Sequence, residues 1–560
     1  MNLRILLILL VVFQNSYGQV SLSADSIRGA LRAERTCFDV TYYDLSVDLN
    51  PDSQYISGSN KIHFIAKEVS SKIQIDLFKQ FNISKLTLQI PLDNDGDIFE
   101  EVNLKYEKVE DALFVYLSEA LKIGSNYILN IDYNGKPNIA KRAPWDGGFV
   151  WSKDSLGRHF AGVACEGHGA SSWWPCKDHL TDEPDSMKMT FTVPGGYKCI
   201  SNGINSSTDT VIKRNEPLQL FNVFEWKVSY PINTYNVTFY LGMFEKIAGT
   251  YISNNDTLNT SFYALDYNVE KARKQFEQVN PMLKIYEDLF GKFPFWNDGY
   301  KLVEAPYLGM EHQTAIAYGN GYQNGYGGIQ PEGVDFDYII IHETGHEYWG
   351  NSVSMEDIAD MWIHESFCTY TEVLYTERMY GKAVALNYLR SQRSRISNDV
   401  PIIGQYGVNK EGSSDMYNKG SWILHTIRNL VDNDSIWFAT LKQFHEDFRL
   451  KNTNGQEVFI WFEKKLGTDI RNIMERFFIN ADIPVLEYQV KRIFWMKKVE
   501  YRWKKERASF NMPIEIIEGD KNYRVIPSLK WQKIKVSNFD EMRLRFSWES
   551  FLYDLVEIKK

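Results

Sequence analysis

Three side chains in a short segment of this sequence could form a metal-dependent catalytic centre. The segment "HETGH" places His342 and His346 four residues apart, with Glu343 directly after the first histidine. On a helix both imidazoles project from one face, and the glutamate reaches the edge of the same cavity. This HExxH pattern is typical of sites in which two neutral imidazoles bind zinc and the glutamate acts as base on a zinc-activated water.

The residues before this motif indicate that its helix is buried. The motif follows the run "YIII", which contains three consecutive isoleucines. Histidine and glutamate side chains on a buried helix are costly unless they have a partner. A metal ion would supply that partner, so we predict one Zn²⁺ per chain.

A third ligand is needed to complete the site. One class of HExxH enzymes uses a histidine six residues after the second motif histidine, preceded by a glycine. Ser352 and Trp349 occupy those positions here, which excludes that class. Glu365 instead follows His346 by nineteen residues. A helix, a short loop and an antiparallel helix would return its carboxylate to the metal, so we predict Glu365 as the third ligand.

The periodicity of the chain indicates which elements position these residues. From Cys37 to about residue 248, polar residues alternate with β-branched or aromatic residues, and turn residues separate the alternating runs. This pattern is typical of strands. From about residue 249 to 482, apolar residues recur three and four apart, as in helices. From about residue 483 the strand-like pattern returns. We predict a multidomain α+β protein with domains at 19–248 (all-β), 249–482 (mostly helical, catalytic) and 483–560 (a short β-sandwich-like module).

Composition excludes several classes of protein. The chain has 560 residues, 44% hydrophobic and 24% charged, as expected for a folded protein with several domains. Its net charge is −10, and it has no stripe of lysine and arginine, so nucleic acid is not an expected partner. Five cysteines without a CxxC do not describe a disulfide framework.

The first residues resemble an export signal. In "MNLRILLILLVVFQNSYGQ", Arg4 precedes an apolar run, and Ser16 and Gly18 provide the small residues expected before a cleavage site. The run is too short to span a bilayer, and no later stretch reaches that length. We therefore predict a signal peptide at 1–18 and an exported protein, periplasmic or secreted, without a stable membrane span.

Around the motif the chain resembles the gluzincin aminopeptidases, the family of aminopeptidase N, the leukotriene hydrolases and their bacterial relatives. The family pattern HExxHxWxGNxVxMxxWxDxWLNEGFAxY is similar to "HETGHEYWGNSVSMEDIADMWIHESFCTY". His364 replaces the usual Asn, and Ser366 and Cys368 replace Gly and Ala, but no ligand position changes. The resemblance implies a thermolysin-like catalytic domain and a peptide substrate with a free N-terminus.

Two more segments carry the resemblance. "APYLGMEHQTA" is similar to the family's Gly-x-Met-Glu-Asn motif, although Leu308 and His312 replace the first Gly and the Asn. The resemblance implies that Glu311 binds the substrate amine, while the backbone at Gly309 and Met310 pairs with the peptide. "DMYNKGSW" is similar to the segment whose tyrosine stabilises the oxyanion, which assigns that role to Tyr417.

The resemblance also implies a second contact to the substrate amine. In the family a Gln or Glu nine residues before the Pro of a Pro-Cys-x-Asp segment makes this contact, which corresponds here to Glu166 in "CEGHGASSWWPCKD". We interpret the nearby His168 and His179 as structural residues or as supports behind the residues that contact the substrate.

The resemblance and the site chemistry leave several functions open. A zinc aminopeptidase is the principal hypothesis. A zinc endopeptidase would share the metal site, but it would not need an amine-binding glutamate such as Glu311. An epoxide-opening lipid hydrolase would need a specific pocket. A peptide-binding relative with a dead site would bind no zinc. In some relatives a long helical last domain supplies a cation that binds the C-terminal carboxylate of the substrate. The last module here is short and strand-like, so the sequence does not indicate which residue would supply such a cation.

Overall fold

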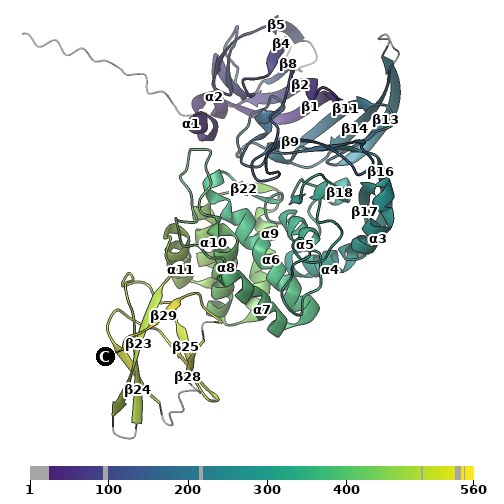
Figure 1. The fold of residues 1–560 in the computed structure, drawn as a ribbon. Coiled ribbons are helices and arrows are strands. Elements are labelled where there is room, and N and C mark those ends of the chain that lie inside the picture. The colour runs from purple at the N-terminus through teal and green to yellow at the C-terminus, as the bar shows by residue number, and fades with distance from the viewer. Residues whose placement is uncertain are drawn as a thin grey trace, which may run out of the picture.

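The computed structural model describes residues 24–91, 99–213, 219–493, 496–536, 544–547 and 549–559. Figure 1 shows three regions along the molecule: strands of the N-terminal region, a group of helices in the middle, and a small group of strands near the C-terminus. The predicted fold class is confirmed. The predicted signal peptide, residues 1–18, lies outside the described residues.

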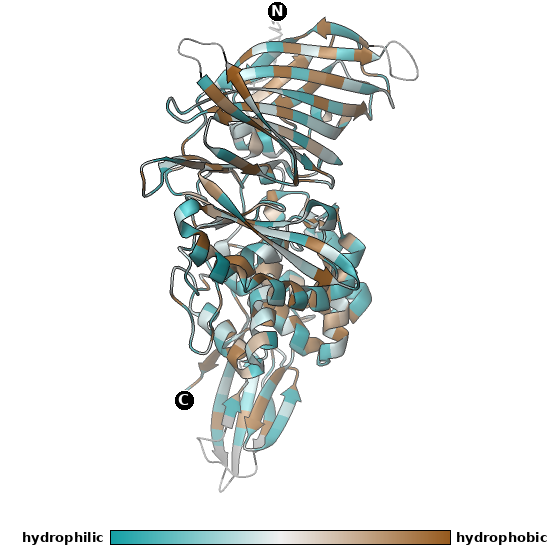
Figure 2. Cartoon of the chain, turned by 90° about the vertical axis from the view of Figure 1, so that its right-hand side faces the viewer, coloured by the Kyte–Doolittle hydropathy of each residue, from teal (hydrophilic) through white to brown (hydrophobic). Residues whose placement is uncertain are grey.

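The N-terminal region is built around a large mixed sheet. Among the described residues this sheet has eight strands in the order β13-β14-β11-β1-β2-β8-β4-β5. In β1, Leu45, Val47 and Leu49 are buried and alternate with partly exposed residues, as the sequence pattern predicts. Figure 2 shows this alternation as brown and teal bands. The strands are β1 (Phe38–Asn50), β2 (Tyr55–Ala66), β4 (Asn82–Pro91), β5 (Phe99–Asn103), β8 (Asn126–Gly135), β11 (Ser186–Pro194), β13 (Ile204–Lys213) and β14 (Gln219–Val228).

Two smaller sheets and two short helices complete this region. One sheet has the order β12-β15-β10-β9 and the other has the order β3-β7-β6. The loop after β10 carries Glu166, so the first of these sheets positions that residue. The elements are α1 (Ala24–Gly29), α2 (Ala33–Thr36), β3 (Lys72–Asp76), β6 (Lys105–Val109), β7 (Ala112–Tyr116), β9 (Gly148–Lys153), β10 (His159–Ala164), β12 (Lys198–Ser201) and β15 (Phe239–Gly242).

The middle region begins with a sheet that the periodicity did not predict. Its order is β16-β17-β18-β20-β19, and β19 is therefore an edge strand. β19 pairs antiparallel with β20 on one side only among the described strands, so its other backbone edge is available to a peptide. The strands are β16 (Phe244–Ser253), β17 (Asp256–Leu265), β18 (Tyr300–Glu304), β19 (Gly309–Met310) and β20 (Ile316–Tyr318).

Helices form the rest of the middle region. They are α3 (Val269–Phe276), α4 (Val279–Phe290), α5 (Tyr338–His346), α6 (Trp362–Tyr380), α7 (Lys382–Arg393), α8 (Asn418–Val431), α9 (Asp434–Phe448), α10 (Gly455–Leu466) and α11 (Thr468–Ile479), with β21 (Val353–Met355) and β22 (Lys451–Thr453) between them. Residues 339–346 of α5 are all buried, as the run of isoleucines predicts. Asp337 caps this helix by accepting a hydrogen bond from the Ile339 N–H.

The C-terminal region is a small two-sheet module. Its sheets have the orders β27-β24-β23-β29 and β26-β25-β28. Trp503, Phe551 and Leu552 of this module belong to the same hydrophobic core as the helices, so the two regions share one core. Within the described residues, no helix is long and apolar enough to cross a membrane. The strands are β23 (Val485–Ile493), β24 (Met496–Trp503), β25 (Ile514–Glu518), β26 (Lys521–Val525), β27 (Gln532–Val536), β28 (Leu544–Phe546) and β29 (Asp554–Glu557).

Candidate active site

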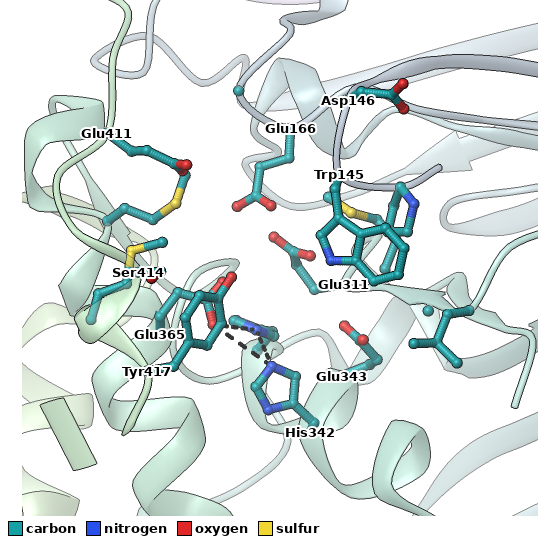
Figure 3. A pocket seen from close by; sticks show the side chains of 18 of the residues that line it. Trp145, Asp146, Glu166, Glu311, His342, Glu343, Glu365, Glu411, Ser414 and Tyr417 are labelled. Atoms are coloured by element: carbon teal, nitrogen blue, oxygen red, sulfur yellow. Dashed lines mark hydrogen bonds and ion pairs between the residues drawn. The ribbon is translucent and has the colours of Figure 1, made fainter. Parts of the chain in front are cut away.

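One cavity brings together every residue that the sequence predicted for the site. It has a volume of about 720 Å³ and is lined by residues of the N-terminal β region and of the helical region. Figure 3 shows the side chains of Glu166, Glu311 and Glu365 directed into it. The predicted residues on its wall are Glu166, Gly309, Met310, Glu311, His342, Glu343, His346, Glu365 and Tyr417.

Two imidazoles and one carboxylate converge in this cavity. Nε2 of His342 lies 3.2 Å from Nε2 of His346. Oε2 of Glu365 lies 3.7 Å from the first nitrogen and 3.5 Å from the second. Ligand distances of about 2.0–2.1 Å in a tetrahedral site place neighbouring ligand atoms about 3.3–3.4 Å apart. The three atoms therefore form a triangle of the size that zinc requires.

Hydrogen bonds fix the orientation of both imidazoles. Nδ1 of His342 donates to Glu372 Oε1 at 2.7 Å, and Nδ1 of His346 donates to the main-chain oxygen of Trp349 at 2.9 Å. Each ring thereby keeps the lone pair of Nε2 directed towards Glu365. Tyr388 donates to the other oxygen of Glu372 at 2.6 Å, which holds that carboxylate in place. Such carboxylate–histidine pairs are the usual support of zinc ligands.

Glu365 supplies the negative charge of the set. It lies in the first turn of α6 and is buried. Burial alone would raise the pKa of Glu365, but the nearby imidazoles of His346 and His342 hold it well below its usual range. Within the described residues its Oε2 has no hydrogen-bond partner. A buried, ionised oxygen of this kind calls for a cation, so the donor set fits zinc.

Glu343 lies beside the ligand set on α5. It is buried, and this burial raises the pKa of its carboxyl group, with Glu311 and Glu365 adding to the effect and the two imidazoles opposing it. A Cβ at Gly309 would lie 2.6 Å from Glu343 Oε1. The absence of a side chain at this glycine of β19 therefore leaves the space that the Glu343 carboxylate occupies.

Two further carboxyl groups, those of Glu311 and Glu166, face the ligand set. Ligand atoms of Glu311, Glu343 and His346 all lie within 4.8 Å of one another. Burial, together with the charges of Glu311 and Glu365, raises the pKa of Glu166 well above its usual range. Within the described residues, Oε1 of Glu166 has no hydrogen-bond partner. An ammonium group placed between these carboxyls would satisfy both.

Loops from distant parts of the chain hold this pair in place. Asn351, which follows the zinc-binding helix, donates to the main-chain oxygen of Glu311 at 2.7 Å. Arg28 of α1 donates to the main-chain oxygen of His168, and Asn409 donates to that of Gly167 at 2.8 Å. The loop that carries Glu166 is thus tied to both the N-terminal segment and the helical region.

Tyr417 lies at the N-terminus of α8. Its ring centroid is 6.5 Å from that of His342, with an angle of 28° between the ring planes. Burial, with the charges of Glu365 and Glu166, raises the pKa of Tyr417 well above its usual range. Its phenol therefore keeps its proton and can donate a hydrogen bond to a negative oxygen.

Sequence reasoning missed Glu372 and Tyr388, which support His342. Glu372 follows Glu365 by seven residues on α6, and this spacing of two helical turns is the signal that could have identified it. The substituted position Cys368 also lies against the site, since its thiol donates to the main-chain oxygen of His342 at 2.8 Å. All five cysteines are buried and unbridged.

Two further histidines of the notable segments, His312 and His179, make structural contacts. Nδ1 of His312 lies 2.7 Å from the hydroxyl of Tyr240. Burial lowers the pKa of His312 to about 3, so its ring is neutral. The ring of His179 contacts the Thr181 hydroxyl at 2.8 Å.

His342, His346 and Glu365 form a donor set of the kind found in HExxH metallopeptidases that use a glutamate as third ligand. A model described as the peptidase M1 N-terminal domain matches residues 40–235, and a model described as the peptidase family M1 domain matches residues 275–477. The chain belongs to peptidase family M1, which confirms the resemblance found in the sequence.

Individual relatives are distant. The chain is 21% identical over 454 residues to endoplasmic reticulum aminopeptidase 1 of Mus musculus, a match that covers 78% of this chain and 47% of that protein. It is 21% identical over 480 residues to aminopeptidase N of Lactobacillus delbrueckii subsp. lactis, covering 80% and 52%. The chain thus spans about half the length of these relatives.

A solved structure shares the fold. An M1 zinc metallopeptidase from Deinococcus radiodurans superimposes with a TM-score of 0.64 at 20% sequence identity, covering 80% of this chain and 94% of that one. A mutant of the same enzyme, in complex with a Tyr-Ser-Ala substrate, gives a TM-score of 0.64 at 19% identity, covering 80% of this chain and 95% of that one.

Proposed function

We propose that this protein is a zinc-dependent aminopeptidase that removes the N-terminal residue from peptides. His342, His346 and Glu365 would hold the zinc ion. When bound, this ion polarises the scissile carbonyl and lowers the pKa of a water molecule towards neutrality. Family membership and the names of two relatives, both aminopeptidases, support the proposal.

The remaining steps follow from the side chains around the ligand set. Glu311 and Glu166 bind the free amine, and the open edge of β19 pairs with the peptide backbone. Glu343 accepts a proton from the attacking water and passes it to the leaving amine. Tyr417 donates a hydrogen bond to the carbonyl oxygen as negative charge develops on it.

The single observation that carries the proposal is the position of the paired carboxyls. Glu311 lies so close to Glu343 and His346 that atoms of all three fall within 4.8 Å. An amine bound at Glu311 therefore leaves the first carbonyl, and no later one, beside the base and the ligand set. This geometry supports the proposal that one residue at a time is removed from the N-terminus.

The experiment compares aminoacyl coumarin amides with their N-acetylated forms, with and without a chelator. We expect cleavage of the free-amine compounds only, loss of cleavage with the chelator, and recovery on addition of zinc. Equal cleavage of the acetylated compounds would favour a zinc endopeptidase instead. Absence of both zinc and turnover in the purified protein would favour a peptide-binding relative.

We also propose that the protein is exported and processed after residue 18. Arg4 and the apolar run that follows it support this proposal, together with Ser16 and Gly18 before the expected cleavage site. Mass spectrometry of the protein from its native host should give a mature N-terminus at Gln19. An intact N-terminus on protein in the cytoplasmic fraction would contradict it.

A further inference from the structure

A second cavity lies beside the one that contains the candidate site. It has a volume of about 350 Å³. Tyr326, Tyr338 and Tyr417 line both cavities and therefore form the boundary between them. Small-molecule sites usually have volumes of about 300–1,000 Å³, so this cavity is large enough for part of a peptide.

The second cavity adjoins a different imidazole of the ligand set from the one near Glu311. Glu311 lies close to His346, since side-chain atoms of the two are within 4.8 Å of each other. The second cavity adjoins the other imidazole: Tyr338 stacks on His342 with ring centroids 5.1 Å apart, and Glu372, which accepts from His342, is part of its wall. A peptide whose amine is held at Glu311 would therefore extend its leaving part past His342 towards this cavity.

The wall of this cavity combines several apolar residues with one available charge. Its apolar residues include Ile329, Pro331, Val334 and Phe336, from the loop that precedes α5. Its two charged residues are Glu372 and Arg395. Glu372 is already engaged by His342 and Tyr388.

Arg395 has no such partner. It follows the end of α7 and is exposed, and its guanidinium makes no hydrogen bond or ion pair with any described residue. Two buried polar side chains of the same wall, Thr369 and Gln392, also each have an oxygen without a partner in the described part of the chain. The wall thus offers an anion-binding group and unused polar atoms beside an apolar surface.

We propose that Arg395 binds the C-terminal carboxylate of short peptides whose leaving part occupies this cavity. The inference rests on the proposed aminopeptidase function and narrows its substrates to peptides short enough to join both ends of the site. A guanidinium can bind a carboxylate through two parallel hydrogen bonds, which fixes the position of the peptide end. An amidated or long peptide would lack this contact.

The experiment compares three substrates: trialanine with a free carboxylate, trialanine amide, and an alanyl coumarin amide that has no carboxylate. We expect Arg395→Ala to lower kcat/KM for the free acid about tenfold, mainly through KM. Turnover of the amide and of the coumarin compound should stay unchanged. Arg395→Lys, which keeps the charge, should restore part of the loss. Lys382→Ala serves as the matched control, because it removes an exposed cation at the other end of α7.

The outcomes separate this inference from the proposed function. Equal kcat/KM for the acid and the amide in the unmodified protein would overturn the role of Arg395, as would an equal effect of Arg395→Ala on both. A trialanine amide analogue with aspartate in third position that matched the free acid would assign Arg395 to acidic side chains, which also overturns the proposal. Failure to cleave the coumarin compound would refute the proposed function itself and this inference with it.

Discussion

In the proposed mechanism, Glu343 moves protons without holding the metal. We expect Glu343→Gln to retain zinc and to lower kcat by a factor of about 10²–10⁴, because the amide cannot accept the proton of the attacking water. Zinc content by elemental analysis and kcat on an aminoacyl coumarin amide would be measured on the same sample. A variant with normal turnover would remove Glu343 from the role of base.

Glu372 orients His342 through a hydrogen bond of 2.7 Å. We expect Glu372→Ala to weaken zinc binding about 10–100-fold, because the imidazole loses its fixed tautomer and orientation. Competition with a fluorescent zinc chelator measures the affinity. Tyr388→Phe removes only the outer hydrogen bond to the same carboxylate and should have a smaller effect. Unchanged affinity in Glu372→Ala would reduce Glu372 to a packing residue.

The nine residues of the candidate site, which line one cavity, were identified from their spacing, from local motifs and from the family resemblance. His342, Glu343 and His346 share one helical turn, and Glu365 returns at a fixed interval along the chain. Glu372 could not be assigned in the same way, since its role depends on facing an imidazole of another helix. Arg395 belongs to no recognisable sequence motif. Its place in the wall of the second cavity is visible only in the structure.

At the scale of elements, the long strands of the N-terminal region were predictable from their alternation. β1 and β2 show clear alternation over more than ten residues. The sheet that ends in β19 was not predicted. Its strands β18, β19 and β20 have five, two and three residues, too short for a periodic signal, and β18 is buried throughout. Its strand β17 has ten residues but was assigned to the helical region. The pairing of such strands is set by the surrounding core rather than by their own sequence.

The contact between α6 and α8 positions Tyr417 relative to Glu365. A Cβ at Gly420 would lie 1.9 Å from Ser366 Oγ, so the helices approach each other as closely as glycine permits. We expect Gly420→Ala to separate them and to lower kcat at least tenfold while zinc remains bound, because Tyr417 would lose its position near the carbonyl.

Ser366→Gly provides the compensating change in a double-mutant cycle. The double variant Ser366→Gly with Gly420→Ala should recover most of the lost kcat, since the added methyl group then has room. The double variant also loses the hydrogen bond that Ser366 donates to the main-chain oxygen of Met416. The single variant Ser366→Gly measures the effect of that loss on kcat. Additive losses in the double variant would show that helix separation is not the cause.

At the scale of the whole molecule, the C-terminal module is joined to the catalytic helices by a common core and by polar contacts. Leu552 N–H donates to Thr426 Oγ1 at 3.0 Å, and His425 of α8 lies 3.2 Å from the main-chain oxygen of Glu549. The periodicity predicted the strands of this module, but not their attachment to α8. Such attachment depends on surfaces that the chain brings together only after both parts have folded.

His425 makes this attachment sensitive to acid. Burial lowers the pKa of His425 to about 3, and the positive charge of Arg428 adds to the effect. An unfolded histidine has a pKa of about 6.5, so between these values the unfolded chain binds a proton that the folded chain does not. The contribution of this residue to stability is therefore complete above about pH 6.5 and is lost as the pH falls.

We expect His425→Gln to lose less stability than the unmodified protein when the pH falls from about 7 to about 5, by about 2 kcal/mol. The measurement is denaturant unfolding at both pH values, followed by the fluorescence of Trp422 and its neighbours in the shared core. His159→Gln, which changes a partly exposed imidazole in the N-terminal region, is the matched control. An equal acid-induced loss in His425→Gln and in the unmodified protein would show that the proton is taken up elsewhere.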